Sequence, residues 1–181
     1  MKTIWTEGAI TIRPYRADDV SELYQSIRES LAEIGPWMEW AHPNYSLEES
    51  AAWVNAREEA RANQTEYSFV ITDTESGAFL GAVGLNQFHP THPIANLGYW
   101  VRTSATGRGA ASTAARLIAR FGFEELHLER IEIVAAVGNH TSQRVAEKTG
   151  AQREGVLRKR LMLYGQPHDA VMFSLVAEDL T

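Results

Sequence analysis

The sequence contains no cysteine, which excludes a disulfide framework and a thiol nucleophile. It has no apolar run long enough to cross a bilayer as a helix. Residues 1–5 continue into polar residues and a strand-like stretch, so we expect no signal peptide. These absences argue against a disulfide-rich secreted protein and a membrane protein. We expect a cytoplasmic location and no membrane partner.

Acidic residues are missing from the middle of an otherwise acidic chain. The 181 residues carry 23 Asp and Glu against 17 Lys and Arg, a net charge of −6. Residues 76–123 contain no Asp or Glu, yet they hold Arg102, Arg108, Arg116 and Arg120. A local positive field in an acidic protein predicts an anionic ligand rather than a surface for nucleic acid. The alternative is a solvated helix face whose arginines pair with carboxylates elsewhere.

The rest of the composition is that of a globular protein. Hydrophobic residues make up 44% of the chain, and five are Trp. A chain of this length buries roughly 70% of its unfolded surface on folding. No repeat, linker or low-complexity tract divides the sequence, so we predict a single domain over residues 1–181. A homodimer is compatible with these features.

Residues 96–122 have the pattern of a strand, a glycine loop and a helix. Leu97, Tyr99 and Val101 alternate with their neighbours as in a half-buried strand. A loop of small residues follows and ends in Gly-Arg-Gly at 107–109. Apolar residues then recur at helical spacing, at Ala111, Ala114, Ala115, Ile118 and Phe121. Such a turn leaves N–H groups unpaired at the positive end of the helix dipole, which predicts binding of phosphate oxygens.

Two familiar phosphate-binding motifs fit these glycines poorly. Residues 107–112 form G-x-G-x-x-S, one glycine short of the dinucleotide fingerprint. That fingerprint normally lies in the first strand–helix unit, whereas this one lies past mid-chain, after strands that look antiparallel. No Lys-Ser or Lys-Thr follows, which excludes the loop of nucleotide triphosphatases. A nicotinamide enzyme remains a rival interpretation.

Two motifs carry a resemblance to a known family. Residues 106–111, Thr-Gly-Arg-Gly-Ala-Ala, resemble the acyl-CoA pyrophosphate loop Q/R-x-x-G-x-G/A of the GNAT N-acetyltransferase superfamily. Residues 139–142, Asn-His-Thr-Ser, resemble its downstream Asn-x-x-Ser or Asn-x-x-Tyr element. Residues 98–101 and 135–139 are similar to the Rim-type branch, which acetylates ribosomal-protein N-termini. Thr106 departs from the usual Gln or Arg, so a side-chain contact to phosphate is lost unless Arg108 replaces it.

The resemblance covers essentially the whole chain and implies a fold and an activity. The fold is α/β (α+β), with a mixed, mostly antiparallel sheet of about seven strands, flanking helices and one parallel strand pair at the cofactor site. The implied activity is transfer of acetyl from acetyl-CoA to a primary amine, which is a protein or peptide N-terminus or a small amine. The implied contacts to acetyl-CoA are Trp100, Val101, Arg102, Thr103, Gly107, Arg108, Gly109, Ala110, Ala111, Ser112 and Asn139.

Patterns along the chain predict the remaining elements. Residues 46–49 form a capping box that opens a helix ending near residue 63, and Gly150 ends another helix over 139–149. A right-handed crossover makes the strand before the glycine loop parallel to the strand over 131–137. Further strands are predicted at 9–14, 66–72, 79–88, 152–163 and 170–176.

The segment over residues 31–45 lacks periodicity and contains Trp37 and Trp40 in a loop bounded by prolines. Two such residues are costly to leave in water. The loop is either a lid over the core or a wall of the acceptor pocket, and the resemblance implies the wall. A second loop contains His89 and His92, but its prolines and the lack of a third ligand argue against metal binding.

Acyl transfer to an amine requires a neutral amine, donors for the tetrahedral oxyanion and a proton for the departing thiolate. The resemblance implies that an N–H near Val101 serves the oxyanion and that Asn139 holds the pantetheine amide. Ser142 is the candidate acid, although Asn139 and Ser142 are also ordinary helix-capping residues. No base is identified, and water is an equal alternative to the candidates Glu39, His89, Glu132 and Glu154. An inert Ser142 would favour a non-catalytic acyl-CoA-binding module.

Overall fold

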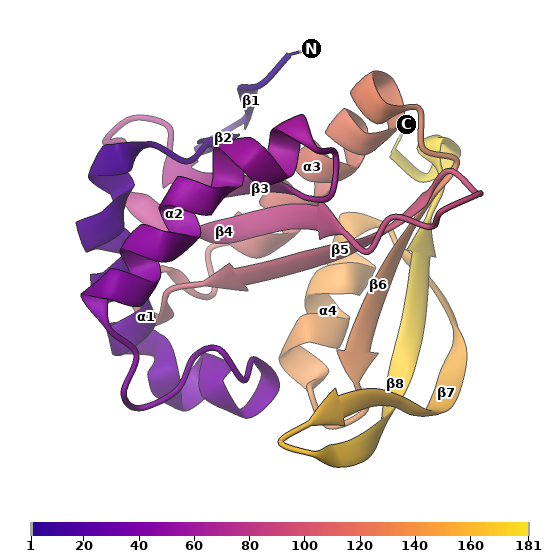
Figure 1. Ribbon diagram of the computed structural model, residues 1–181. Coiled ribbons are helices and arrows are strands. Elements are labelled where there is room, and N and C mark those ends of the chain that lie inside the picture. The colour runs from indigo at the N-terminus through magenta and orange to yellow at the C-terminus, as the bar shows by residue number, and fades with distance from the viewer. Residues whose placement is uncertain (1, 181) are drawn as a thin grey trace.

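One mixed sheet of eight strands, in the order β1-β2-β3-β4-β5-β6-β8-β7, runs through the protein (Figure 1). The computed structural model describes residues 2–180. Neighbouring strands pair antiparallel except β5 and β6, which are parallel. The strands are β1 (Trp5–Glu7), β2 (Ile10–Pro14), β3 (Tyr67–Asp73), β4 (Phe79–Asn86), β5 (Ile94–Val101), β6 (Arg130–Ala136), β7 (Gln152–Leu163) and β8 (Gln166–Leu175).

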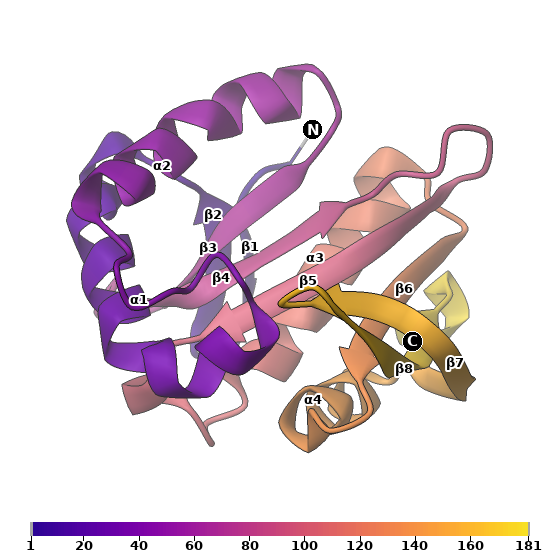
Figure 2. The same ribbon diagram turned by 60° about the horizontal axis from the view of Figure 1, so that its bottom comes forward.

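Helices cover both faces of this sheet (Figures 1 and 2). The α-helices are α1 (Val20–Ile34), α2 (Leu47–Ala62), α3 (Ala110–Leu126) and α4 (His140–Thr149). Short 3₁₀ turns are η1 (Ala17–Asp19), η2 (Gly35–Trp37), η3 (Thr103–Ala105) and η4 (Ala177–Leu180). Alternate residues of the central strands point to opposite layers: Leu97 packs with the core under α3, and Trp100 with the core under α1 and α2. None of the helices in residues 2–180 is long and apolar enough to span a membrane.

The predicted fold class is confirmed, with two differences in the elements. The sheet has eight strands rather than about seven, because β1 is three residues long and too short to show alternation. Helix α1 continues to Ile34, so the aromatic loop begins later than residue 31. The predicted capping box is present: Ser46 Oγ accepts from Glu49 N at 3.3 Å, and Glu49 Oε2 accepts from Ser46 N at 2.9 Å.

The parallel pair β5 and β6 separates soon after it begins. Only Ile94, Ala95 and Asn96 pair with β6, whereas β5 stays with β4 as far as Val101. The N–H of Arg102 donates to Leu80 O of the β4 side at 2.8 Å. Alternation therefore turns the N–H groups of Val101, Tyr99 and Leu97 to the other edge, which faces the gap. The gap is thus bordered by a free strand edge.

The β7–β8 hairpin reaches across the sheet to the loop after α1 (Figure 2). Its turn residues Tyr164 and Gly165 both have positive φ, 52° and 71°, as a two-residue hairpin turn of the primed type requires. The hydroxyl of Tyr164 donates to Gly35 O at 2.5 Å, and its backbone N–H donates to the Glu39 carboxylate. These two bonds, which we call the clasp, join the β7–β8 turn to the segment after α1.

Candidate active site

A row of unpaired N–H groups follows the glycine loop, as the sequence predicted. Gly107 and Gly109 have φ of 77° and 79°, the left-handed region that favours glycine. The first backbone bond after the loop is Thr113 N to Gly109 O, at 3.0 Å. The N–H groups of residues 107–112 have no hydrogen-bond partner within residues 2–180. They lie at the N-terminus of α3, where the helix dipole favours an anion.

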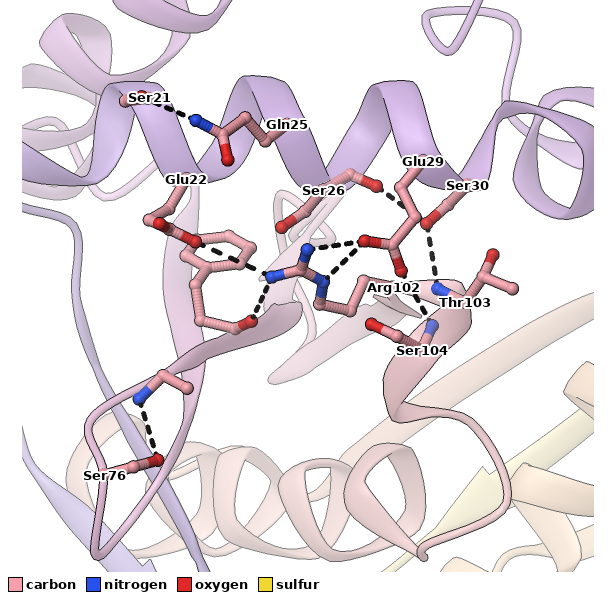
Figure 3. A network of polar contacts seen from close by, with 12 residues as sticks. Ser21, Glu22, Gln25, Ser26, Glu29, Ser30, Ser76, Arg102, Thr103 and Ser104 are labelled. Carbon is pink, nitrogen blue, oxygen red and sulfur yellow. Dashed lines mark hydrogen bonds and ion pairs between the residues drawn. The ribbon is translucent and has the colours of Figure 1, made fainter.

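Arg102 binds helix α1 rather than the glycine loop (Figure 3). Its guanidinium donates to Glu29 Oε2 from Nε at 3.1 Å and from Nη2 at 2.5 Å. The other Glu29 oxygen accepts from Ser104 N at 2.8 Å, and Ser30 Oγ accepts from Thr103 N at 3.0 Å. The bonds from Arg102 and Ser104 lower the pKa of Glu29 to about 2. Helix α1 therefore fixes the segment that leads into the loop.

Most arginines of residues 76–123 pair with carboxylates, as the alternative interpretation of a solvated helix face expected. Besides Arg102, Arg116 pairs with Glu7 at 2.6 Å and Arg120 with Glu124 at 3.3 Å. The exposed Arg108 makes no hydrogen bond or ion pair within residues 2–180. Thr106 Oγ1 donates to Thr103 O at 2.8 Å. A positive charge for an anion at the loop thus comes from the helix dipole and Arg108.

A first cavity, of about 140 Å³, lies in the gap between β5 and β6. Asn139 and Ser142, two of the residues that the sequence suggested, line it together with Trp37 from the aromatic loop. Asn139 Oδ1 accepts from Ser142 N at 3.0 Å, so Asn139 is the N-cap of α4. The side-chain NH₂ group of Asn139 has no hydrogen-bond partner within residues 2–180. The remaining lining residues are Met38, Leu97, Gly98, Tyr99, Ile133, Val134, Ala135, Ala136, Leu161 and Leu163.

Tyr99 bridges the gap to Ser142. Its hydroxyl donates to Ser142 O at 2.7 Å and lies 3.1 Å from Ser142 Oγ. Burial raises the pKa of Tyr99 to about 12, so the phenol keeps its proton at neutral pH. Sequence analysis missed this residue as a site residue because its alternation in β5 explains it as a core position. The sequence did contain one indication of its role, because Tyr99 lies in the strand that was predicted to run parallel to the strand over 131–137.

A second, larger cavity of about 510 Å³ lies on the α1/α2 face of the sheet. It meets the first cavity at Met38, Gly98 and Tyr99, which line both. Trp40 lines only the second cavity and packs edge-on against Trp100, with ring centroids 5.9 Å apart. The other lining residues are Tyr15, Leu23, Ile27, Tyr45, Glu49, Ala52, Trp53, Glu66, Ser68, Ala82, Val83, Gly84 and Asn86.

None of the four candidate bases lines either cavity. Glu39 is part of the clasp, and His89 Nδ1 accepts from Thr91 N at 3.2 Å in the β4–β5 loop. Arg130 lies 2.9 Å from Glu132 and 2.6 Å from Glu154, and it lowers the pKa of Glu154 to about 2. A carboxylate held in this way is a weak base.

The carboxylates that do line a cavity are Glu49 and Glu66, both in the second one. Each is already paired: Glu49 lies 2.9 Å from His42 Nε2, and Glu66 lies 2.7 Å from Arg57. The sequence marked Glu49 as a capping residue, which concealed its place beside the cavity. No group of three or more metal-binding side chains occurs within residues 2–180.

Comparison with known proteins identifies this arrangement. The model of the family described as acetyltransferase (GNAT) domain matches residues 9–152. A protein of Bacillus subtilis named “Putative ribosomal N-acetyltransferase YdaF” is 30% identical over 173 residues, covering 94% of this chain and 92% of that protein. The ribosomal-protein-serine acetyltransferase of Escherichia coli is 22% identical, and 98% of each chain is covered.

A solved structure shares the fold. The ribosomal L7/L12 α-N-protein acetyltransferase RimL, in complex with coenzyme A, superposes with a TM-score of 0.87. The two chains are 21% identical, and the match covers 98% of this chain and 99% of that one.

Proposed function

The chain belongs to the GNAT acetyltransferase family, and on that premise we propose that its acceptor is the α-amino group at the N-terminus of a protein or peptide. As a member of the family it is an acetyl-CoA-dependent N-acetyltransferase that acts on amines. The names of the relatives from Bacillus subtilis and Escherichia coli support a ribosomal or other protein N-terminus. The structural observation that carries the proposal is that the two cavities adjoin at Gly98, which lines both.

The pyrophosphate of acetyl-CoA binds the N–H groups of residues 107–112 in this proposal. Six consecutive unpaired donors at a helix N-terminus suit phosphate oxygens, and Arg108 adds a positive charge. Arg102 contributes indirectly, because its bonds to Glu29 hold the preceding segment. Thr103 cannot donate its N–H to the cofactor, since that group already donates to Ser30 Oγ.

The pantetheine arm lies in the gap along the free edge of β5. The N–H groups of Leu97, Tyr99 and Val101 face that edge, so the arm pairs with them as an added strand would. The amide of Asn139 is free to bind one of its carbonyl oxygens. The thioester carbonyl then meets an N–H near Val101, which stabilises the oxyanion.

The reaction forms one bond and breaks one. The neutral amine attacks the thioester carbonyl carbon, and the carbon–sulfur bond breaks when the tetrahedral intermediate collapses. The thiolate of CoA takes a proton from Ser142, whose hydroxyl contacts the Tyr99 phenol at 3.1 Å, and water returns a proton to the serine oxygen. The amine loses its proton through water or a paired carboxylate at the second cavity. Tyr99 positions Ser142, because its hydroxyl donates to Ser142 O and contacts Ser142 Oγ.

A matched peptide panel tests the acceptor. Each peptide is offered with a free and with an acetyl-blocked N-terminus, and each contains one internal lysine. We expect release of free CoA thiol only with free N-termini, with the new acetyl group located on the α-amino nitrogen by fragment mass spectrometry. Acetylation of the lysine instead would contradict the proposal, and so would turnover confined to small amines.

The two other classes considered for this chain receive less support. A non-catalytic acyl-CoA-binding module is not favoured, because the relatives are acetyltransferases. A nicotinamide enzyme is not favoured either, since the glycine loop follows a strand paired antiparallel to β4 in a GNAT fold. Acetyl-CoA is a cytoplasmic metabolite, which supports the same location for an enzyme that consumes it.

A further inference from the structure

The walls of the second cavity are aromatic and partly open to water. Trp40 and Trp53 are 44% and 39% exposed, and both line this cavity. Large aromatic surfaces left in water are costly, so an apolar occupant that covers them gains free energy. Five aromatic residues other than Tyr99 line the cavity: Tyr15, Trp40, Tyr45, Trp53 and Trp100. Its volume of about 510 Å³ suits a bulky side chain rather than a methyl group.

The cavity offers little to a second charge on the acceptor. Glu66 already pairs with Arg57 and accepts from Ser68 Oγ at 2.5 Å. Glu49 accepts from Ser46 N at 2.9 Å and pairs with His42. A polyamine or an amino sugar would find few polar side chains besides Ser68, Asn86 and the two paired carboxylates, so most of its further polar groups would be desolvated at a cost. The lining therefore favours an acceptor that is apolar apart from its amine.

Gly98 lies where this cavity adjoins the first one, since it lines both. A Cβ added to Gly98 would meet nothing within 4 Å, and its φ is outside the left-handed region. Its partner across β4, Gly84, is different: a Cβ there would approach Tyr67 O at 3.0 Å. Packing thus accounts for glycine at 84 but not at 98. A side chain at 98 would stand where the cavities meet.

We propose that the acceptor is a primary amine carrying a bulky apolar group beside the amino nitrogen, with that group in the aromatic cavity and the nitrogen reaching the thioester past Gly98. This inference rests on the proposed function and specifies its substrate. The preferred peptides begin with Met, Leu, Phe or Trp rather than with Gly, Ala or Ser. A free arylalkylamine is a small molecule that offers the same combination of a primary amine and a bulky apolar group.

The first test compares peptides that differ only in their first residue. Burying a Phe or Leu side chain corresponds to about a 10- to 100-fold gain. We therefore expect kcat/KM for Phe-Ala-Ala-amide to exceed that for Ala-Ala-Ala-amide by this factor, and phenethylamine to exceed ethylamine in the same direction. Equal values within each pair overturn the inference and leave N-terminal acetylation intact. Turnover of phenethylamine without any peptide leaves the cavity assignment intact and contradicts the peptide acceptor.

A matched pair of variants on helix α2 tests whether the apolar group of the acceptor binds in the second cavity. Ala52 and Ala56 are both exposed, but only Ala52 lines the cavity. Ala52→Leu should reduce the preference for the Phe peptide to below about threefold with acetyl-CoA affinity unchanged, whereas Ala56→Leu should leave it at the wild-type value. The same preference in both variants would place the apolar group elsewhere.

A binding measurement keeps the inference testable without turnover. In the presence of CoA, N-acetyl-Phe-Ala-Ala-amide should bind at least about tenfold more tightly than N-acetyl-Ala-Ala-Ala-amide, by calorimetry. Gly98→Val should keep a melting temperature close to that of the wild type, because a Cβ at this position meets nothing within 4 Å. It should nevertheless lose transfer to the Phe peptide. Equal product affinities, or wild-type transfer by Gly98→Val, overturn the inference.

Discussion

The hydroxyl of Tyr99 on β5 and the carbonyl oxygen of Ser142 on α4 lie 2.7 Å apart across the gap of the sheet. This bond spans 43 residues of sequence and places a protonated phenol 3.1 Å from the Ser142 hydroxyl. A phenol is a better match than an alcohol for protonating a thiolate, because its pKa lies closer to that of a thiol. Under the proposed mechanism, both hydroxyls of this pair stand where the departing thiolate needs a proton.

The first prediction concerns this pair. Tyr99→Phe and Ser142→Ala should each lower kcat by about 100-fold, the low end for a positioned acid, since water substitutes in part. The affinity for acetyl-CoA should stay near the wild-type value, because the proton is given in the transition state. The double variant should be no slower than the slower single variant. Losses that multiply would show independent roles, and melting curves control for the N-cap of α4.

The second prediction concerns the glycine loop. Asp and Asn both tolerate the left-handed conformation of Gly109, and a side chain there meets nothing within 4 Å. Gly109→Asp should weaken acetyl-CoA binding by about tenfold more than Gly109→Asn, which corresponds to about 1.4 kcal/mol for the charge. Calorimetric titration of each variant measures the difference. Equal affinities would mean that no phosphate contacts these amides.

The third prediction separates the two tryptophans of the aromatic loop. Trp37 lines the first cavity and Trp40 the second. Trp40→Ala should therefore raise the acceptor KM more than the acetyl-CoA KM, and Trp37→Ala should do the reverse. Steady-state titrations of both substrates measure the two values. If both variants melt early with unchanged kinetics, the loop is only a lid over the core.

The fourth prediction concerns pH. The folded pKa of Glu29, about 2, lies below its ordinary value of 4.5. Its carboxylate therefore stabilises the fold above pH 4.5, and this stabilisation is lost as the pH falls toward 2. Glu29→Gln should lower the melting temperature at pH 7, with a deficit that shrinks over that acidic range. Glu22→Gln is the control, because Glu22 is 52% exposed and lies 3.6 Å from Arg102; a pH-independent deficit in Glu29→Gln would contradict the assignment.

Local patterns in the sequence predicted the elements that carry the site. The glycine loop, the start of α3 near residue 110 and the end of α4 at Gly150 follow from backbone preferences that act over a few residues. The parallel pair followed from the handedness of the crossover. The separation of β5 from β6 after Asn96 did not, because no periodicity reports where two strands part.

The partners of the charged and polar groups could not be predicted in the same way. Arg102 suggested an anion site from its position, yet its carboxylate partner Glu29 lies 73 residues earlier. Glu66 lines the second cavity only because β3 passes beneath α2. Sequence spacing specifies residues on one element, whereas these contacts depend on which elements pack together. For the same reason, the general base that would deprotonate the amine could not be assigned from the sequence.

The clasp has a consequence for the order in which the protein becomes functional. Strands β1 to β5 pair with their neighbours in chain order, so they can assemble as they leave the ribosome. The bond from Tyr164 to Gly35 instead joins residues 129 apart. Contacts of such high sequence separation form late, because they carry a large loop-closure cost. A nascent chain therefore completes the β5 wall of the gap before the clasp can form, and we expect acetyl transfer to begin only after the β7–β8 hairpin has folded back onto the loop after α1.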